Sequence, residues 1–274
     1  MLDFTVYKDL GEFTALFEFD KKLDRLKELA IPEQWDYRNP GCDGEQQPNK
    51  ILRNYIRHTF GRLLDEHSTA GTPDEQQSII YIKEDDDPKK SLACFNTGLF
   101  TPKFNPIYAL MYKNTRDNNP CPYFFFNFLE ESENKLQDVL ILPRRANYFT
   151  NPSELIYDHN LTLRRDLDHI LQDNKERFPE RIRESPYLSL ILDGAISRAL
   201  KRVQANYKTA VPNYFDKEIS LLLPICFEDN APAELALAIR RCEGFYVAKT
   251  ILTIDMAYND ARLIAKPDVD WLAP

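Results

Sequence analysis

Glycine is scarce in this sequence, and the glycine-dependent motifs of nucleotide and ester chemistry are missing with it. The chain has 274 residues, of which only 8 are glycine. It contains no Gly-x-x-x-x-Gly-Lys-Ser/Thr, no Gly-x-Gly-x-x-Gly and no Gly-x-Ser-x-Gly segment. These absences remove the main support for a P-loop nucleotide hydrolase, a Rossmann-type dehydrogenase and an α/β-hydrolase.

Histidine and cysteine are too few and too scattered for a zinc centre. The four histidines and five cysteines include no Cys-x-x-Cys pair and no His-Glu-x-x-His segment. One set of hard-metal ligands remains, because Asp166, His169 and Asp173 share a helix face at i, i+3 and i+7. A solvated row of charges explains that set more simply, so we expect no metal site, and the sequence indicates no particular cofactor.

Long apolar runs and an excess of basic charge are also lacking. No apolar segment approaches the ~20 residues of a membrane span, and the first residues are acidic rather than basic. We therefore expect a cytoplasmic protein without a membrane partner. The 35 Lys and Arg against 43 Asp and Glu give a formal charge of −8. Such a surface repels phosphate unless basic residues gather locally, so we expect no binding to long duplex DNA.

The apolar pattern that is present predicts an ordinary globular fold, with 43% apolar and 12% aromatic residues. Residues 50–67 follow Asn49 and carry an apolar stripe at helical spacing. Residues 78–128 are rich in β-branched and aromatic residues between turn sequences, which predicts an antiparallel meander. Residues 163–178 are amphipathic, and a long buried helix is predicted to start near Pro186.

The last third alternates between apolar segments. Residues 217–227 and 245–254 are nearly continuous apolar strands, and residues 234–241 between them are predicted to form a short helix that Asn230 opens and Gly244 closes. This pattern favours a βαβ unit. We predict an α/β or α+β fold over 1–274 as a single globular domain, with a mixed sheet, an N-terminal meander and a C-terminal βαβ unit, flanked by helices.

The first candidate site follows the last strand. Asp255 is a predicted N-cap, and Tyr258, Asn259 and Arg262 follow it on one helix face. Ligands settle at the carboxyl ends of strands in sheets of this type, and an amide, a ring and a planar cation suit a base and a phosphate. An internal Arg–Asp pair in a capped helix is the alternative.

A second candidate lies on the long helix and just beyond it. Residues 175–208 contain eight Lys and Arg against four Asp and Glu. Arg202 and Asn206 lie at the edge of the apolar stripe, and Lys208 follows. A basic pocket in an acidic protein favours a small anionic ligand. Cationic side chains that simply cover an apolar stripe are the alternative.

The third candidate is a short polar segment between two strands, Asn96 and Thr97, which could hydrogen-bond a base or a ribose. A tight turn is the alternative. Arg57, on the helix over 50–67, is the basic residue of that helix that we expect to face a site. If the protein is an enzyme, His169 or Asp255 is the best available general acid or base.

Seven segments carry a resemblance that spans nearly the whole chain: WDYRNP, ILRNYIRHTFGRLLDE, FNTGLF with IYALM, LDHILQDNKERFP, NYKTAVPNYF, LLLPICF and ILTIDMAYNDARLIAKPDVDWL. In this order they resemble an uncharacterised bacterial family of domains of unknown function. The resemblance implies an RNA context, because some such domains are joined to or near winged-helix modules of the LOTUS (OST) type, which are thought to bind RNA. We expect no such module in this chain.

These observations predict a domain that binds a nucleotide or the end of a single-stranded RNA. An enzyme of this kind would cleave or transfer a phosphoester as a hydrolase or transferase. The alternative is a non-catalytic nucleotide sensor or a protein-interaction module of an RNA-processing complex. The sequence does not indicate the oligomeric state.

Overall fold

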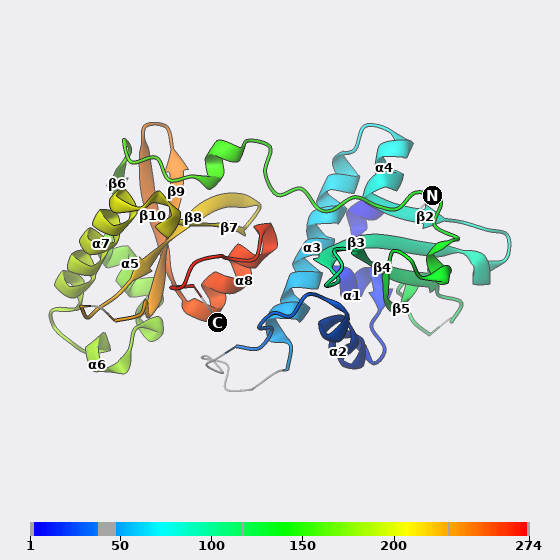
Figure 1. The fold of residues 1–274 in the computed structure, drawn as a ribbon, viewed down its shortest axis with the longest axis horizontal. Helices are drawn as coiled ribbons and strands as arrows, with labels where there is room; N and C mark the ends of the chain where they lie inside the picture. The colour runs from blue at the N-terminus through cyan, green and yellow to red at the C-terminus, as the bar shows by residue number, and fades with distance from the viewer. Residues whose placement is uncertain (1–2, 38–47, 117, 230, 273–274) are drawn as a thin grey trace. The chain divides into compact units, whose positions relative to one another are not determined.

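The chain forms two compact units, each built around its own sheet. The computed structural model describes residues 3–37, 48–116, 118–229 and 231–272. Unit 1 comprises Met1–Asp36 and Gln47–Asn147, and unit 2 comprises Tyr37–Gln46 and Tyr148–Pro274. Each unit holds a mixed five-stranded sheet (Figure 1). The α+β class is therefore confirmed, with two mixed sheets where one was expected. The single domain over 1–274 stays a prediction.

The sheet of unit 1 is the predicted meander with one added strand. Its order is β1-β5-β4-β3-β2, and neighbours from β2 to β5 are antiparallel. The two-residue β1 pairs parallel to β5. The strands span Thr14–Ala15 (β1), Ile80–Lys83 (β2), Leu92–Phe100 (β3), Pro106–Lys113 (β4) and Tyr123–Glu130 (β5).

Helices cover one face of this sheet through aromatic contacts. The helices are α1 (Leu10–Phe13), α2 (Phe19–Leu29), α3 (Lys50–Thr69) and α4 (Pro73–Ile79). Phe60 of α3 packs on Phe95 of β3 with ring centroids 4.9 Å apart. Phe13 stacks on Tyr123 of β5 at 5.1 Å. The other face packs on Leu136 and neighbouring apolar residues that follow β5. Both faces are thus buried, which explains the nearly continuous apolar run of β3.

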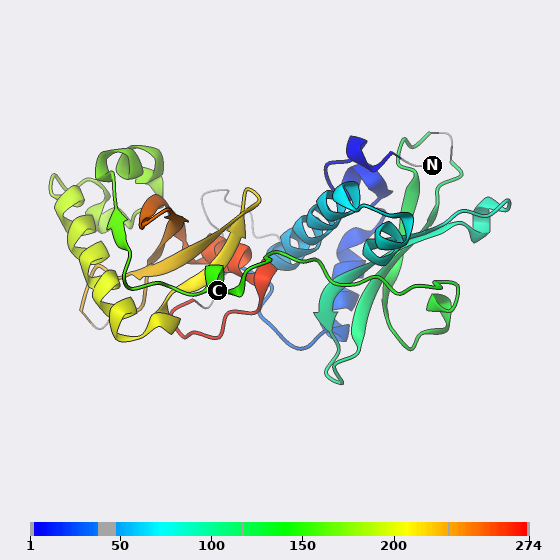
Figure 2. The same cartoon turned by 90° about the horizontal axis from the view of Figure 1, so that it is seen from above.

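Unit 2 is a sheet with helices on both faces. Its order is β6-β10-β9-β8-β7, in which only β6 is parallel to its neighbour. The strands span Thr162–Arg164 (β6), Val211–Phe215 (β7), Glu218–Ile225 (β8), Leu235–Cys242 (β9) and Phe245–Thr253 (β10). The helices are α5 (Leu167–Asn174), α6 (Glu180–Arg183), α7 (Leu188–Ala205) and α8 (Ile254–Ile264). Figures 1 and 2 show α5 and α7 on one side of the strands and α8 on the other.

Short 3-10 turns complete the described part of the chain, at Phe4–Val6, Pro88–Lys90, Asn134–Leu136, Pro152–Leu155, Lys175–Arg177 and Tyr207–Thr209. No helix in the described ranges is long and apolar enough to cross a membrane.

The predicted βαβ unit is wrong, because the segment assigned to its helix is strand β9. It pairs antiparallel with both β8 and β10, while Asn230, the expected helix start, lies outside the described residues. Leu235, Leu237 and Ile239 join the core under α5 and α7, and the alanines between them face the other side. Leu and Ala favour a helix locally, but an eight-residue segment between two strands gains hydrogen bonds on both edges.

One glycine of β3 is required by both its backbone and its neighbour. Gly98 has φ of +76°, and a Cβ there would lie 2.6 Å from the Tyr55 hydroxyl of α3. A left-handed backbone costs a non-glycine residue about 1–2 kcal/mol. The close approach of Tyr55 adds an overpacking cost of about 1–3 kcal/mol.

We predict that Gly98→Ala lowers the free energy of unfolding by about 2–5 kcal/mol in urea denaturation. The same change in a Tyr55→Phe background should cost less, because the clashing oxygen is gone. The Tyr55→Phe variant alone is the control. Equal costs in the two backgrounds would contradict the clash and leave only the backbone term.

Candidate ligand-binding site

Unit 2 contains a cavity between the α8 side of its sheet and α8 itself. Its volume is about 540 Å³, within the range of small-molecule sites. The lining residues come from all four antiparallel strands, the β7–β8 turn and two helices: Tyr37, Arg177, Asn213, Phe215, Asp216, Glu218, Ser220, Ala238, Arg240, Lys249, Thr250, Leu252, Met256, Asn259 and Asp260.

The strand sequences leave room for this cavity. Side chains alternate across a strand, so the large apolar residues of β8 and β9 pack under α7, while Ser220 and Ala238 face α8. Two small side chains on neighbouring strands thus leave volume unfilled between the sheet and α8. A register shift between Ala248 and Thr250 marks a β-bulge in β10, and Lys249 is the extra residue. Bulges redirect side chains, and here a lysine is directed to the cavity lining.

Three cations line the cavity, and they differ in how far they are already engaged. Arg240 forms an ion pair with Glu218 at 3.0 Å. Arg177 donates to Asn174, to the Thr250 hydroxyl and to the Ile251 carbonyl. Lys249 is exposed and makes no hydrogen bond or ion pair with any residue the structure describes. Lys249 is therefore the cation with its full charge available to a ligand.

Asp260 is the acidic counterpart, and it is half-buried without an ion pair to any cation that the structure describes. Burial raises the pKa of its carboxyl from the ordinary 3.8 to about 7, against the opposing effect of the Asn259 amide. Asn259 Nδ2 donates to Asp260 Oδ1 over 3.5 Å. Asn259 Oδ1 is itself buried and has no partner among the described residues. The Asn259 amide oxygen is thus a buried acceptor without a donor among the described residues, which costs free energy unless a ligand supplies one. The adjacent carboxyl of Asp260 has only the long contact from Asn259.

The mouth of the cavity offers aromatic and amide groups. Phe215, at the end of β7, is 65% exposed, which is unusual for a phenylalanine ring on a cavity wall. Tyr37 lies on the same lining. Asn213 is buried and accepts a hydrogen bond from Ser220 through its Oδ1. Its amide N–H groups are donors that could meet a ligand carbonyl.

The structure places the four residues predicted on the last helix together on α8, but only one of them lines the cavity. All four are buried on α8. Of these, Asn259 lines the cavity and Asp255, Tyr258 and Arg262 do not. None of those three side chains is free, since each makes contacts of its own. The N-cap of the helix is Thr253, which accepts from Met256 N, and Asp255 lies inside the first turn. The N-cap role expected for Asp255 is therefore wrong.

The residues predicted on and after the long helix lie away from the cavity lining. Arg202 donates to Cys226 Sγ over 3.2 Å. Asn206 caps the next turn by accepting from Lys208 N. His169 is exposed on α5, on the opposite face of the sheet, with Nδ1 3.5 Å from Asp173 Oδ2. These contacts explain the residues as local structure, and their predicted ligand or catalytic roles stay predictions.

The third predicted cluster belongs to unit 1 and is satisfied internally. Asn96 donates to the Pro143 carbonyl and accepts from Gly98 N, and Thr97 donates to the Ile107 carbonyl at 2.7 Å. Both residues are buried. Arg57 forms an ion pair with Asp9. The tight turn expected between two strands is wrong, because Asn96 and Thr97 lie within β3, where the pairing with β4 becomes irregular after Asn96. Their side chains bond to the backbone there, so this cluster is a weaker candidate than the cavity of unit 2.

Sequence reasoning missed the groups that define the cavity. Lys249 lies within an apolar strand segment. The β-bulge that exposes its side chain has no recognisable pattern in the sequence. Asp260 stands beside the predicted Asn259, but its burial depends on how α8 packs against the sheet. A phenylalanine next to a turn, Phe215, is the sequence feature that could have pointed to the cavity.

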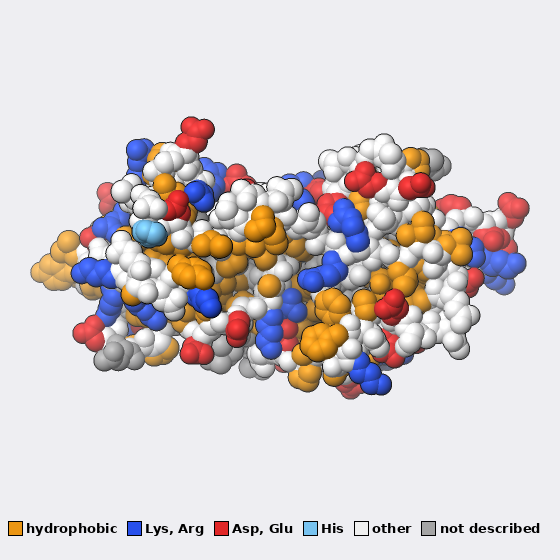
Figure 3. All heavy atoms as spheres, turned by 45° about the horizontal axis from the view of Figure 1, so that its top comes forward, with side chains coloured by type: hydrophobic (Ala, Val, Ile, Leu, Met, Phe, Trp, Pro, Cys, Tyr) orange, Lys and Arg blue, Asp and Glu red, His pale blue; other side chains and the backbone are white. Residues whose placement is uncertain are grey.

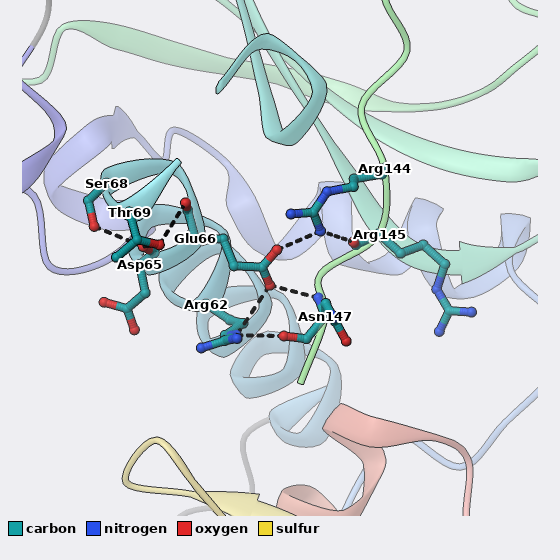
Figure 4. A network of polar contacts seen from close by, with 8 residues as sticks. All are labelled: Arg62, Asp65, Glu66, Ser68, Thr69, Arg144, Arg145 and Asn147. Atoms are coloured by element: carbon teal, nitrogen blue, oxygen red, sulfur yellow. Dashed lines mark hydrogen bonds and ion pairs between the residues drawn. The ribbon is translucent and has the colours of Figure 1, made fainter. Parts of the chain in front are cut away.

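A charged network in unit 1 is a structural anchor rather than a second site. Glu66 of α3 is buried, and its Oε1 accepts from Asn147 N at 2.7 Å and lies 3.2 Å from Arg62 Nε. Its Oε2 lies 2.6 Å from Arg144 Nη1 (Figure 4). Two cations and a backbone amide thus surround the carboxylate, although Oε2 lies in an ion pair without accepting a hydrogen bond from the described residues. The network ties residues 144–147 to α3.

Charges of the two signs are mixed on the surface. On the described part of the face in Figure 3, Lys and Arg side chains are interspersed with Asp and Glu. The described residues also include no group of three or more His, Cys, Asp or Glu side chains that could hold a metal ion.

Comparison with known proteins identifies a family. A family model described as "Domain of unknown function (DUF3825)" matches residues 26–271. Neither the curated proteins nor the solved structures gave a match.

We predict that Asp260→Asn stabilises the protein in a pH-dependent way. Because the carboxyl pKa is raised in the folded state to about 7, the free energy of unfolding of the wild type falls as pH rises from about 4 to 7. Urea denaturation should show the variant more stable at pH 8, by up to about 4 kcal/mol at about 1.4 kcal/mol per pKa unit. Near pH 4 the two proteins should differ by less than about 1 kcal/mol. A variant less stable at pH 8 would contradict an unpaired buried carboxylate.

We predict that neutralising the carboxylate of the anchor in unit 1 destabilises the protein. Glu66→Gln should lower the free energy of unfolding by about 1–3 kcal/mol, because it removes the charge that Arg62 and Arg144 face. The exposed Glu28→Gln is the matched control and should change little. Equal effects of the two substitutions in urea denaturation would rule out the anchoring role.

Proposed function

We propose that this chain, which belongs to the DUF3825 family of domains of unknown function, binds a nucleotide, or the terminal nucleotide of an RNA, in the cavity of unit 2. One observation carries the proposal. A cavity of about 540 Å³ combines a lysine and a half-buried carboxyl, neither of which forms an ion pair with a described residue, with an exposed aromatic ring. A protein can recognise a nucleotide by its phosphate, by the edge of its base and by the face of its base. The cavity offers one matching group for each of these three.

Lys249 is the phosphate-binding group in this proposal. Lysine binds phosphate as a point charge, and a cation that is not already paired loses no existing contact when it does so. Arg240 contributes less, because Glu218 already neutralises it at 3.0 Å. The hydroxyls of Ser220 and Thr250 line the same cavity, but they already donate to Asn213 and Asn174, so the charge of Lys249 is the main attraction for a phosphate. A single focused phosphate also suits an acidic chain better than a long polyanion does.

Phe215 is the stacking surface for the base. Stacking of a base on an aromatic ring contributes about 1–3 kcal/mol to binding. The ring of Phe215 is exposed and therefore accessible for such a contact. Asn213 and Asn259 offer amides at the lining for the edge of the base. This arrangement supports a base-containing ligand over inorganic phosphate alone.

The catalytic form of the proposal is cleavage or transfer of a phosphoester. Asp260 is the lining group able to exchange a proton near neutral pH, because its pKa is raised to about 7 by burial. The form without catalysis is a nucleotide sensor or an interaction module of an RNA-processing complex. Incubation with end-labelled RNA and dinucleotides separates the two, since only an enzyme forms product.

The RNA context and the cytoplasmic location are parts of the proposal. They rest on the resemblance to bacterial domains found with LOTUS-type modules and on five scattered cysteines that suggest no disulfide framework. A cytoplasmic nucleotide pool is the setting in which such a pocket would operate.

We predict that a mononucleotide raises the melting temperature of the wild type. At a concentration of 100 Kd, binding adds about 2.7 kcal/mol to the free energy of unfolding. Lys249→Gln should weaken binding roughly 10- to 100-fold, because it removes a charge-assisted contact. The exposed Lys201→Gln on α7 is the matched control and should bind as the wild type does. Calorimetric titration with AMP, GMP, CMP and UMP measures these affinities. Absence of binding to all four nucleotides would overturn the proposed function.

A further inference from the structure

The acceptors that α8 leaves unsatisfied extend the proposed function to the identity of the base. Asp260 and Asn259 are consecutive residues of α8 and both line the cavity. The carboxyl receives one long contact, from Asn259 Nδ2 at 3.5 Å, and no ion pair from the described residues. The amide oxygen of Asn259 has no partner there either. This wall therefore calls for a ligand edge that carries donors.

The charged groups around Asp260 do not meet that need. On the neighbouring strand and on α8 itself, Arg241 pairs with Asp158 and Arg262 makes contacts of its own. Arg177 is engaged by Asn174 and by groups of β10, and Arg240 is paired with Glu218. Lys249 is the phosphate group of the proposed function. Asp216 and Glu218, on the β7–β8 side, are acceptors themselves. A ligand edge with donors would therefore complete this wall without displacing an existing ion pair.

The four RNA bases differ in the donors of their pairing edge. Guanine presents two adjacent donors, the N1–H and an N–H of the 2-amino group. Adenine and cytosine each pair one amino donor with a ring-nitrogen acceptor, and uracil has a single donor. A carboxylate accepts two parallel N–H groups through its two oxygens, as it does from an arginine.

We propose that the bound base is guanine and that the Asp260 carboxylate is the specificity-determining residue, accepting from N1–H and from the 2-amino group. This inference rests on the proposed function. It matches the acceptors of Asp260 and Asn259 to guanine, the one RNA base whose pairing edge supplies two donors side by side. Phe215 would stack on the same base, and Lys249 would bind its phosphate.

The pH dependence of binding has a definite sign. Without ligand the Asp260 carboxyl titrates at about 7. Two N–H donors stabilise its ionised form and lower its pKa in the complex. Binding therefore releases a proton below neutral pH, and the affinity for GMP rises as pH rises toward 7 and levels off above it. Repulsion between Asp260 and the phosphate would give the opposite trend.

The test is calorimetric titration of the full chain at pH 8 with GMP, IMP and AMP. IMP differs from GMP only by the missing 2-amino group. The wild type should bind GMP roughly 10- to 100-fold more tightly than IMP, and AMP no better than IMP. Asp260→Asn should bring GMP down to the affinity of IMP. This variant removes a half-buried charge that forms no ion pair with the described residues, so it is expected to fold. The exposed Asp168→Asn on α5 is the matched control and should keep the preference for GMP.

The outcomes separate this inference from the proposed function. Equal affinities of the wild type for GMP, IMP and AMP would overturn guanine recognition and leave nucleotide binding in place. Retention of the GMP preference by Asp260→Asn would overturn the role of Asp260. An affinity for GMP that falls as pH rises from 6 to 8 would do the same. No binding of any nucleotide would overturn the proposed function itself.

Discussion

A carboxyl group that the fold partly removes from water without a described cation beside it is costly, and in unit 2 that group is Asp260. Its burial follows from the packing of α8 against the sheet, and its lack of a partner follows from Arg240 and Arg177 being engaged elsewhere. A fold that needed only stability would gain from an asparagine or an apolar residue there. Stability given up at a cavity wall is typical of a binding site, and this is why the site is assigned to unit 2.

Much of the fold could be predicted from the sequence, because its local and tertiary preferences agree. The apolar stripe of α3, the meander over β2 to β5 and the long helix α7 lie where their patterns indicate. The failure at β9 is instructive. Leu235 to Ile239 would suit either a buried helix or a buried strand, and only the neighbouring strands decide between them. The second sheet could not be inferred for the same reason.

The site was less predictable than the fold, because it depends on which polar groups remain unpaired. Asn96, Thr97 and Arg57 looked available in the sequence, but each has a partner in unit 1. Asn259 was correctly placed at the end of the last strand and lines the cavity. Lys249 and Asp260 were not predicted. A β-bulge brings Lys249 to the cavity lining and the packing of α8 brings Asp260 there, and the local sequence encodes neither feature recognisably. Pairing is a tertiary property, so composition and spacing cannot reveal its absence.

The location of the site is the central claim, and amide chemical shifts of the isotopically labelled protein during titration with GMP test it most directly. The cavity predicts shifts concentrated at Asn213, Phe215, Lys249, Asn259 and Asp260. It also predicts that Asn96 and Thr97 of unit 1 and His169 of α5 stay unchanged. Shifts centred on Asn96 and Thr97, or on Arg202 to Lys208, would contradict the assignment and restore one of the sites that the sequence alone suggested.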